Sequence, residues 1–215
     1  MRAIQAVATA AFLALGACAT VPPPSPPVLA FDRADCGAVD LSQAISLTSP
    51  KERAVHHVTK TVDGSAACAI LEGGASAYAL FALPTDTGDK TLTVGAALEP
   101  QRILSPAVAV LDAEGRQTRR FRADEFMYRG LNYSVVLRPR ETERFVVVSI
   151  DPSRVGQRYD SIVIGTNASS TYTPYGPVTI MTGADAAQSR VFSYEGAAFV
   201  TVNDSDTKEE GPPAG

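Results

Sequence analysis

The chain has 215 residues and a formal net charge of −4. This length is enough for one or two domains, and the mild acidity gives no reason to expect a nucleic acid as a partner. After residue 17 the sequence has no apolar stretch that is long enough to span a membrane as a helix.

The N-terminus is typical of a secretory signal, with a positive charge at Arg2 and an apolar run over residues 3–17. That run has about 15 residues, whereas a spanning helix needs about 20. It ends in "LGAC", residues 15–18, which resembles the bacterial lipoprotein box. We therefore expect residues 1–17 to be a lipoprotein signal peptide and Cys18 to be lipidated. An ordinary signal peptide that leaves a free thiol is the alternative.

A lipidated Cys18 would carry several acyl chains, and two or more chains hold a protein stably on a membrane. The next residue is Ala19 rather than aspartate. By resemblance to bacterial sorting signals, this favours the outer membrane, on its periplasmic face. The following "TVPPPSPP" predicts extended polyproline, so we expect residues 18–30 to form a spacer that lifts a domain off the membrane. A terminus without a spacing role is the alternative.

Two cysteines remain once Cys18 is assigned to lipid, namely Cys36 and Cys68. In an oxidising compartment such a pair is a candidate disulfide, and two buried thiols are the alternative. The bridge would close a loop of about 30 residues and stabilise the fold by about 3 kcal/mol in the chain-entropy model.

The region after the spacer predicts a β fold. A weak helical turn at residues 40–45 comes first, and from Ala67 onward short runs rich in Val, Ile, Thr, Tyr and Phe follow, bounded by turn sequences such as "DAEG" and "GADA". The predicted strands are 76–84, 90–98, 107–112, 133–139, 144–151, 161–165, 177–183 and 197–202.

Strands at intervals of about 8–12 residues, without a sustained helical period, indicate an all-β sandwich or barrel. We expect an antiparallel β-sandwich of jelly-roll or immunoglobulin-like type over residues 31–202. Residues 31–66 could form a small N-terminal subregion of it. The polar segment 203–215 predicts a disordered tail.

One candidate binding segment is "GTNASSTYTPYGP", residues 165–177, which predicts a loop rich in Ser, Thr and Tyr. Its Tyr172 and Tyr175 could stack on a ligand, because an aromatic ring combines apolar area with a polar group. A flexible connection with the rings packed at its base is the alternative.

A second candidate is the arginine-rich segment 116–130, which includes Arg119, Arg120 and Arg122. Guanidinium groups match carboxylates and phosphates, so these side chains could bind an anionic group. A solvated edge strand that is protected from aggregation by its charge is the alternative.

Motifs of metal binding and catalysis are missing from the sequence. The two histidines, His56 and His57, are neighbours and would point to opposite faces of a strand, and no cysteine or carboxylate cluster stands at metal-ligand spacing around them. Nucleophile elbows, phosphate-binding loops and zinc-protease motifs are also lacking. We therefore expect no metal, no cofactor and no enzymatic activity.

The stretch that begins "SAYALFALPTDTGDKTLTVGAALEP" and continues through "SPAVAVLDAEG" to "LRPRETERFVVVSID" resembles the maltose-operon periplasmic protein family. The resemblance covers roughly residues 67–155. It implies a periplasmic location and, by operon context, a link to carbohydrate uptake. It supplies no catalytic motif.

Together these features predict a non-catalytic, lipid-anchored periplasmic accessory or binding protein, linked to the transport of carbohydrate such as maltose or maltodextrin. Its partners would be the membrane, through the lipid, and an envelope protein or a glycan, but no nucleic acid. The alternative is a structural outer-membrane lipoprotein that docks on an envelope or secretion complex.

Overall fold

The computed structural model describes residues 22–51, 55–86 and 90–203. The predicted signal peptide, the lipidation site Cys18 and nearly all of the predicted tail lie outside these residues. Among the described residues, none of the helices combines the length and the apolar character needed to cross a membrane.

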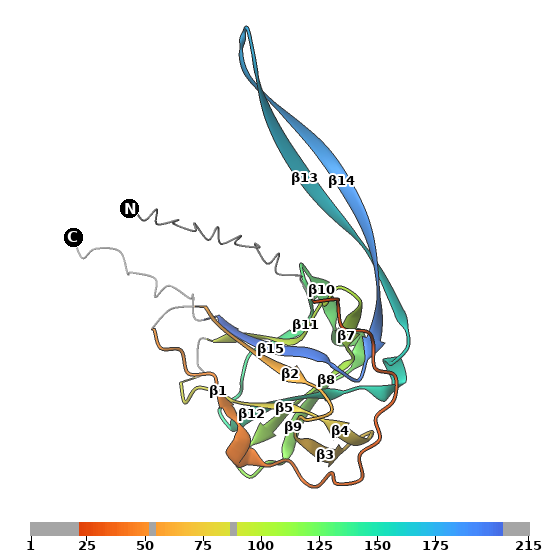
Figure 1. The fold of residues 1–215 in the computed structure, drawn as a ribbon. Coiled ribbons are helices and arrows are strands. Elements are labelled where there is room, and N and C mark those ends of the chain that lie inside the picture. The colour runs from red at the N-terminus through yellow and green to blue at the C-terminus, as the bar shows by residue number, and fades with distance from the viewer. Residues whose placement is uncertain (1–21, 52–54, 87–89, 204–215) are drawn as a thin grey trace, which may run out of the picture.

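Two five-stranded sheets form the body of the protein (Figure 1). The first sheet has the order β1 (Ile45–Ser46), β5 (Ala79–Ala82), β12 (Glu143–Ile150), β8 (Pro106–Asp112) and β9 (Gln117–Phe121). The second has the order β10 (Met127–Arg129), β11 (Asn132–Leu137), β6 (Thr91–Ala97), β15 (Gly196–Asn203) and β2 (His56–Val62). Within these sheets every pairing is antiparallel except that of β1 with β5. The predicted all-β, antiparallel sandwich is confirmed.

The remaining elements are smaller or lie outside the two sheets. They are the 3-10 helices η1 (Leu41–Gln43), η2 (Ala123–Glu125) and η3 (Pro152–Arg154), the strand pair β3 (Cys68–Leu71) and β4 (Gly74–Ala77), and a third sheet of β13 (Arg158–Thr173), β14 (Gly176–Ser193) and β7 (Arg102–Leu104). The weak helical turn predicted at residues 40–45 is thus the single 3-10 turn η1.

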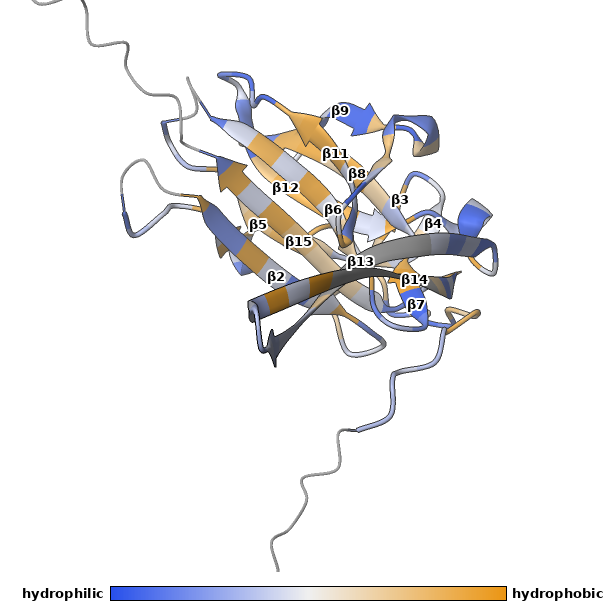
Figure 2. Cartoon of the chain, turned by 90° about the horizontal axis from the view of Figure 1, so that it is seen from above, coloured by the Kyte–Doolittle hydropathy of each residue, from blue (hydrophilic) through white to orange (hydrophobic). Residues whose placement is uncertain are grey.

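The core lies between the two five-stranded sheets, where buried apolar side chains of both sheets form one cluster. In β6, Leu92 and Val94 are fully buried, and Val146 and Val148 of β12 are buried in the same cluster. Figure 2 shows the apolar residues of the sheets as orange bands, among them those of β12. Since burial of one such side chain is worth about 1.5–3 kcal/mol, the burial of these apolar side chains holds the sheets together.

The proline-rich segment before the body makes contacts from Pro26 onward. The backbone N–H of Val28 donates to Ser193 Oγ at 2.8 Å, and the N–H of Tyr194 donates to the carbonyl of Val28 at 2.9 Å. Arg102 Nη1 donates to the carbonyl of Pro26 at 3.4 Å. This part of the predicted spacer therefore lies against the body, beside β7 and the end of β14.

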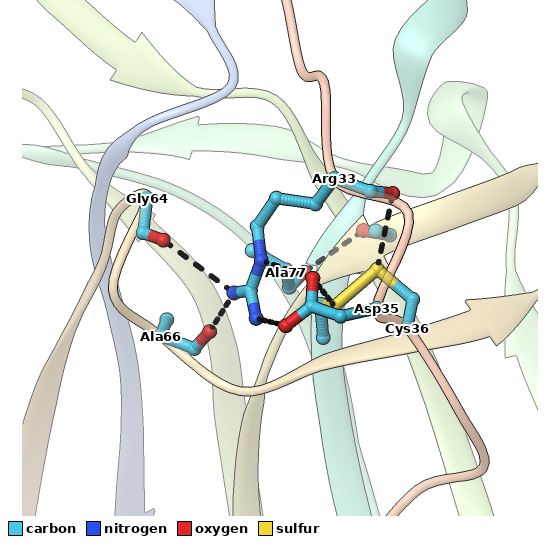
Figure 3. Close-up of a disulfide and its surroundings, with 8 residues drawn as sticks. Arg33, Asp35, Cys36, Gly64, Ala66 and Ala77 are labelled. Carbon is cyan, nitrogen blue, oxygen red and sulfur yellow. Dashed lines mark hydrogen bonds and ion pairs between the residues drawn. A yellow bond between two sulfur atoms is a disulfide. The ribbon is translucent and has the colours of Figure 1, made fainter.

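The expected disulfide joins Cys36 to Cys68, whose Cα atoms lie 4.9 Å apart (Figure 3). It fastens the N-terminal segment to β3. Nearby, Arg33 pairs with Asp35 at 2.7 Å and also donates to the carbonyl of Ala66. Asp35 lies close to both sulfur atoms, but these are bonded to each other, so the cluster offers no free thiolate to a metal.

The prediction of a loop at residues 165–177 is wrong, and so is the prediction of a turn at "GADA", residues 183–186. Both segments belong to β13 and β14, which pair without a break from Arg158 with Val191 to Thr173 with Gly176. The chain reverses through Pro174 and Tyr175, and Gly176, the first residue of β14, has a positive φ of 119°, which glycine adopts without a steric penalty. Threonine, valine and isoleucine favour strands, so the polar composition does not prevent pairing.

Candidate functional site

The β13–β14 hairpin projects far beyond the sandwich (Figure 1). We call residues 161–189 of this hairpin the arm. In the arm, β13 pairs only with β14, and β14 meets β7 only at Val191–Ser193, below the arm. At about 3.3 Å per residue, the β13 side of the arm spans about 40 Å. An isolated two-stranded hairpin is only marginally stable, so the residues at its base must hold it.

Phe192 anchors the hairpin in the core. Its side chain is 1% exposed, and its ring meets the edge of Tyr133 at a centroid distance of 5.4 Å. The guanidinium of Arg154 lies over both rings, 4.1 Å from the centroid of Phe192 and 4.8 Å from that of Tyr133. The backbone N–H of Phe192 donates to the carbonyl of Gln157 at 3.0 Å. Apolar burial, cation–π contact and backbone pairing thus fix the same residue.

Tyr159 fixes the other strand of the hairpin. Its ring stacks on that of Tyr128 in β10, with centroids 3.5 Å apart and planes 8° from parallel. Burial raises the pKa of Tyr128, so its phenol stays neutral. The Tyr128 hydroxyl oxygen is buried and makes no hydrogen bond of good geometry among the described residues, although the nearby Arg154 guanidinium partly offsets the rise in its pKa. The ring, rather than the hydroxyl, therefore supports the hairpin.

Arg190 closes the base of the arm from the β14 side. It is 3% exposed, and its Nε donates to the carbonyl of Glu99 at 2.6 Å while its Nη1 donates to Ser161 Oγ at 2.8 Å. Arg102, on the adjacent β7, pairs with Glu99 at 2.7 Å and with Glu195 at 3.4 Å. The guanidinium groups of Arg190 and Arg102 are both satisfied by groups of this chain, so these two side chains hold the base of the arm and are not free for a ligand.

The tip of the arm presents the two tyrosines that the sequence singled out. Tyr172 is 87% exposed and Tyr175 is 99% exposed. Val178 and Ile180, next to them on β14, are also exposed. The alternative interpretation of this segment, a flexible connection with the tyrosine rings packed at its base, does not agree with their exposure at the tip. Apolar side chains gathered at an exposed end are typical of an interaction site, and the binding role of the tyrosines stays a prediction.

The three candidate arginines do not converge. Arg119 forms a two-pronged contact with Glu143, at 2.7 and 2.6 Å. Arg120 pairs with Glu72 at 2.8 Å, and Arg122 pairs with Asp124 at 3.2 Å. Each guanidinium therefore has its own carboxylate. Anion binding by these residues stays a prediction, to which this geometry gives no support.

Glu143 is the buried half of a brace between β9 and β12. Burial by itself favours the neutral acid, but hydrogen bonds from Arg119, from the backbone N–H of Arg140 and from Thr118 outweigh it, so the pKa of Glu143 is lowered. The carboxylate therefore stays ionised at neutral pH. Its oxygens are occupied by donors, which makes it a structural group and not a proton donor.

A concave hollow of about 300 Å³ lies beside β2. Polar groups of Gln43, Lys60, Asp63 and Ser65 line it, and Tyr78 forms part of its wall. Small ligands bind in concave sites with a few converging polar groups, whereas the tip of the arm is convex. The hollow thus suits a small polar molecule, and the tip suits the surface of a macromolecule.

Comparison with known proteins confirms the resemblance seen in the sequence. Residues 73–152 match the model of the family described as maltose operon periplasmic protein precursor. The match runs from the start of β4 to the end of β12. Neither a curated protein nor a solved structure matches the chain. The matched segment includes seven of the ten strands of the two five-stranded sheets, as well as β4 and β7, and the arm lies outside it.

The role of Tyr128 predicts a contrast between two substitutions. Tyr128→Phe keeps the stacking ring and removes an unsatisfied hydroxyl, so the free energy of unfolding should be unchanged or about 1 kcal/mol higher. Tyr128→Ala removes the ring and should lower it by about 3 kcal/mol. Chemical denaturation measures both values. A loss of more than about 1 kcal/mol for Tyr128→Phe would show that the hydroxyl has a partner.

Proposed function

We propose that this protein is a non-catalytic accessory protein of the periplasm that presents the tip of the arm to a protein partner in the cell envelope. The match of residues 73–152 to a periplasmic family supports the location. The exposed tyrosines at the end of a projecting hairpin carry the proposal of partner binding.

A protein partner fits the tip better than a sugar does. Tyr172 and Tyr175 lie at a convex tip and are largely exposed, whereas a sugar would need a surrounding pocket. Tyrosine gives a large contact area at a low cost in conformational entropy, and it is enriched among the residues that dominate binding energy at protein interfaces. The tip thus has the composition and the shape of an anchor that inserts into a depression on a partner.

The link to carbohydrate rests on the family match. The family description names a maltose operon, and this context links the family to the uptake of maltose or maltodextrin. We propose that the partner belongs to such an uptake system. The polar hollow beside β2 is where a small saccharide would fit. The second candidate function, an outer-membrane lipoprotein that docks on an envelope or secretion complex, is favoured by the arm and differs only in the partner.

We further propose that Cys18 is lipidated and holds the protein on the periplasmic face of the outer membrane. The support is the "LGAC" sequence at residues 15–18 and the exposed prolines that follow. The chain reaches the body at Pro26, beside Arg102 of β7, and β7 pairs with the lower end of β14. The tether and the arm would then leave the same region of the body. Confinement near the membrane would raise the local concentration of the tip around a membrane-bound partner.

Lipidation predicts that Cys18→Ala abolishes membrane attachment. The variant should remain unprocessed or appear in the soluble fraction, because no acyl chain could be added. Cell fractionation after a salt wash, followed by mass analysis of the N-terminus, measures this. A variant that still sediments with outer membranes would overturn the proposed anchor.

The proposed binding role predicts that the double variant Tyr172→Ala/Tyr175→Ala captures the envelope partner at least about 10-fold less well, as expected for loss of interface anchors. The melting temperature should stay constant, because neither ring contacts the body. Quantitative pull-down from envelope extracts measures capture, and calorimetry with maltodextrin measures sugar binding.

The matched control is Met127→Ala/Leu131→Ala, which removes two exposed apolar side chains from the body. It should capture the partner like the parent. Capture by the tyrosine double variant at the parent level would refute the role of the tip. Loss of maltodextrin binding alone would instead identify a glycan as the ligand.

A further inference from the structure

The arm leaves backbone edges unpaired over most of its length. β13 has no neighbour other than β14 among the described strands, so its outer edge is open from Ser161 to Thr173. The sequence from Ser161 to Ala184 contains no Asp, Glu, Lys or Arg. Proteins usually protect open edges with charges, prolines, bulges or a covering element. The missing protection indicates that a strand pairs there.

The two edges of the arm are not equivalent. Pro177 lies opposite Tyr172 and has no N–H, so this pair cannot exchange hydrogen bonds within the hairpin. Hydrogen-bonded and non-hydrogen-bonded residue pairs alternate along an antiparallel hairpin, and in the non-hydrogen-bonded pairs the N–H groups point away from the partner strand. The N–H groups of Tyr172 and Ser170 therefore point outward on β13, and that of Thr179 points outward on β14.

The β14 edge carries obstacles to strand addition. Pro177 removes one of its outward donors, Asp185 places a charged residue in the strand, and β7 occupies the lower end at Val191–Ser193. The β13 edge has neither a proline nor a charged residue between Ser161 and Thr173. A strand that adds to the arm would therefore add to β13.

We propose that the β13 edge pairs with the same edge of a second copy of this chain, antiparallel and about a twofold axis. A twofold axis makes an edge complementary to itself, and two uncharged edges do not repel each other. The antiparallel arrangement sets the tip of one arm beside the base of the other. The two bodies, which carry nearly all of the charge of this acidic chain, then lie at opposite ends.

Pairing would also account for the stability of so long a ribbon. Two joined arms form a four-stranded sheet, and three or more strands are needed for a sheet to be stable by itself. This inference goes beyond the proposed function, because it uses the backbone edge. Side chains stand perpendicular to a sheet, so the ring of Tyr172 would remain available to a partner.

The test compares two proline substitutions, one on each strand of the arm, at residues that lie directly opposite each other. Ser170 and Thr179 lie opposite each other, and their hydroxyl oxygens are 3.0 Å apart. Ser170→Pro removes an outward N–H from the β13 edge, and the matched control Thr179→Pro removes one from the β14 edge. Both variants lose the same hydroxyl contact. Sedimentation velocity over a range of concentrations, with the full mature chain, measures association.

The parent and Thr179→Pro should both show a concentration-dependent species of twice the monomer mass, and Ser170→Pro should associate at least about 10-fold more weakly, since the blocked edge loses backbone hydrogen bonds within the pairing. A parent that stays monomeric at every concentration overturns the proposal, and points to a strand of another protein if the edge is covered in cells. Equal association of the two variants overturns the assignment to β13.

Hydrogen exchange of the unaltered protein gives an independent reading if a proline variant fails to fold. The outward amides of Ser170 and Tyr172 should exchange more slowly as the concentration rises, whereas that of Thr179 should not change. Protection of all three, or of none, contradicts pairing through the β13 edge.

Discussion

The structure depends on one buried side chain, the phenylalanine at the lower end of β14. Phe192 belongs to the core between the sheets, and the strand that carries it continues into the arm. Because Phe192 is held by the ring of Tyr133, by the Arg154 guanidinium and by backbone hydrogen bonds, the direction in which the hairpin leaves the body is fixed. A ribbon without such an anchor would have no defined position, and its tip could not present a site.

Much of the sandwich could be predicted from the sequence because its signals are local. The alternation in β6, the turn sequence after β8 and the run of β-branched residues in β12 each lie within a few residues of one another. The disulfide could be inferred from the even number of cysteines left after Cys18. The strand β2 was missed because "HHVTKTV" is mostly polar, and only its position at the edge of a sheet, beside β15, makes it a strand.

The arm and the ion pairs of Arg119 and Arg120 could not be predicted, because they depend on partners far away in the sequence. A segment rich in Ser, Thr and Tyr resembles a loop until β14 is placed beside it, and the pairing of Arg158 with Val191 joins residues more than thirty positions apart. Arg119 is likewise defined by Glu143, across an intervening strand. The tyrosines could be selected as candidates from their type, but their exposure follows only from the length of the hairpin.

The chain combines a sandwich, of which residues 73–152 match the maltose-operon periplasmic protein family, with a projecting arm that lies outside the match. The most direct test is to replace residues 162–187 with an Asn-Gly turn, which suits a two-residue hairpin, and to measure thermal unfolding. If the base is self-sufficient, the midpoint should stay within about 3 °C of the parent, a change of less than about 1 kcal/mol for a domain of this size. A fall of more than about 10 °C would show that the arm is part of the folding core, and would contradict its assignment as a projection dedicated to binding.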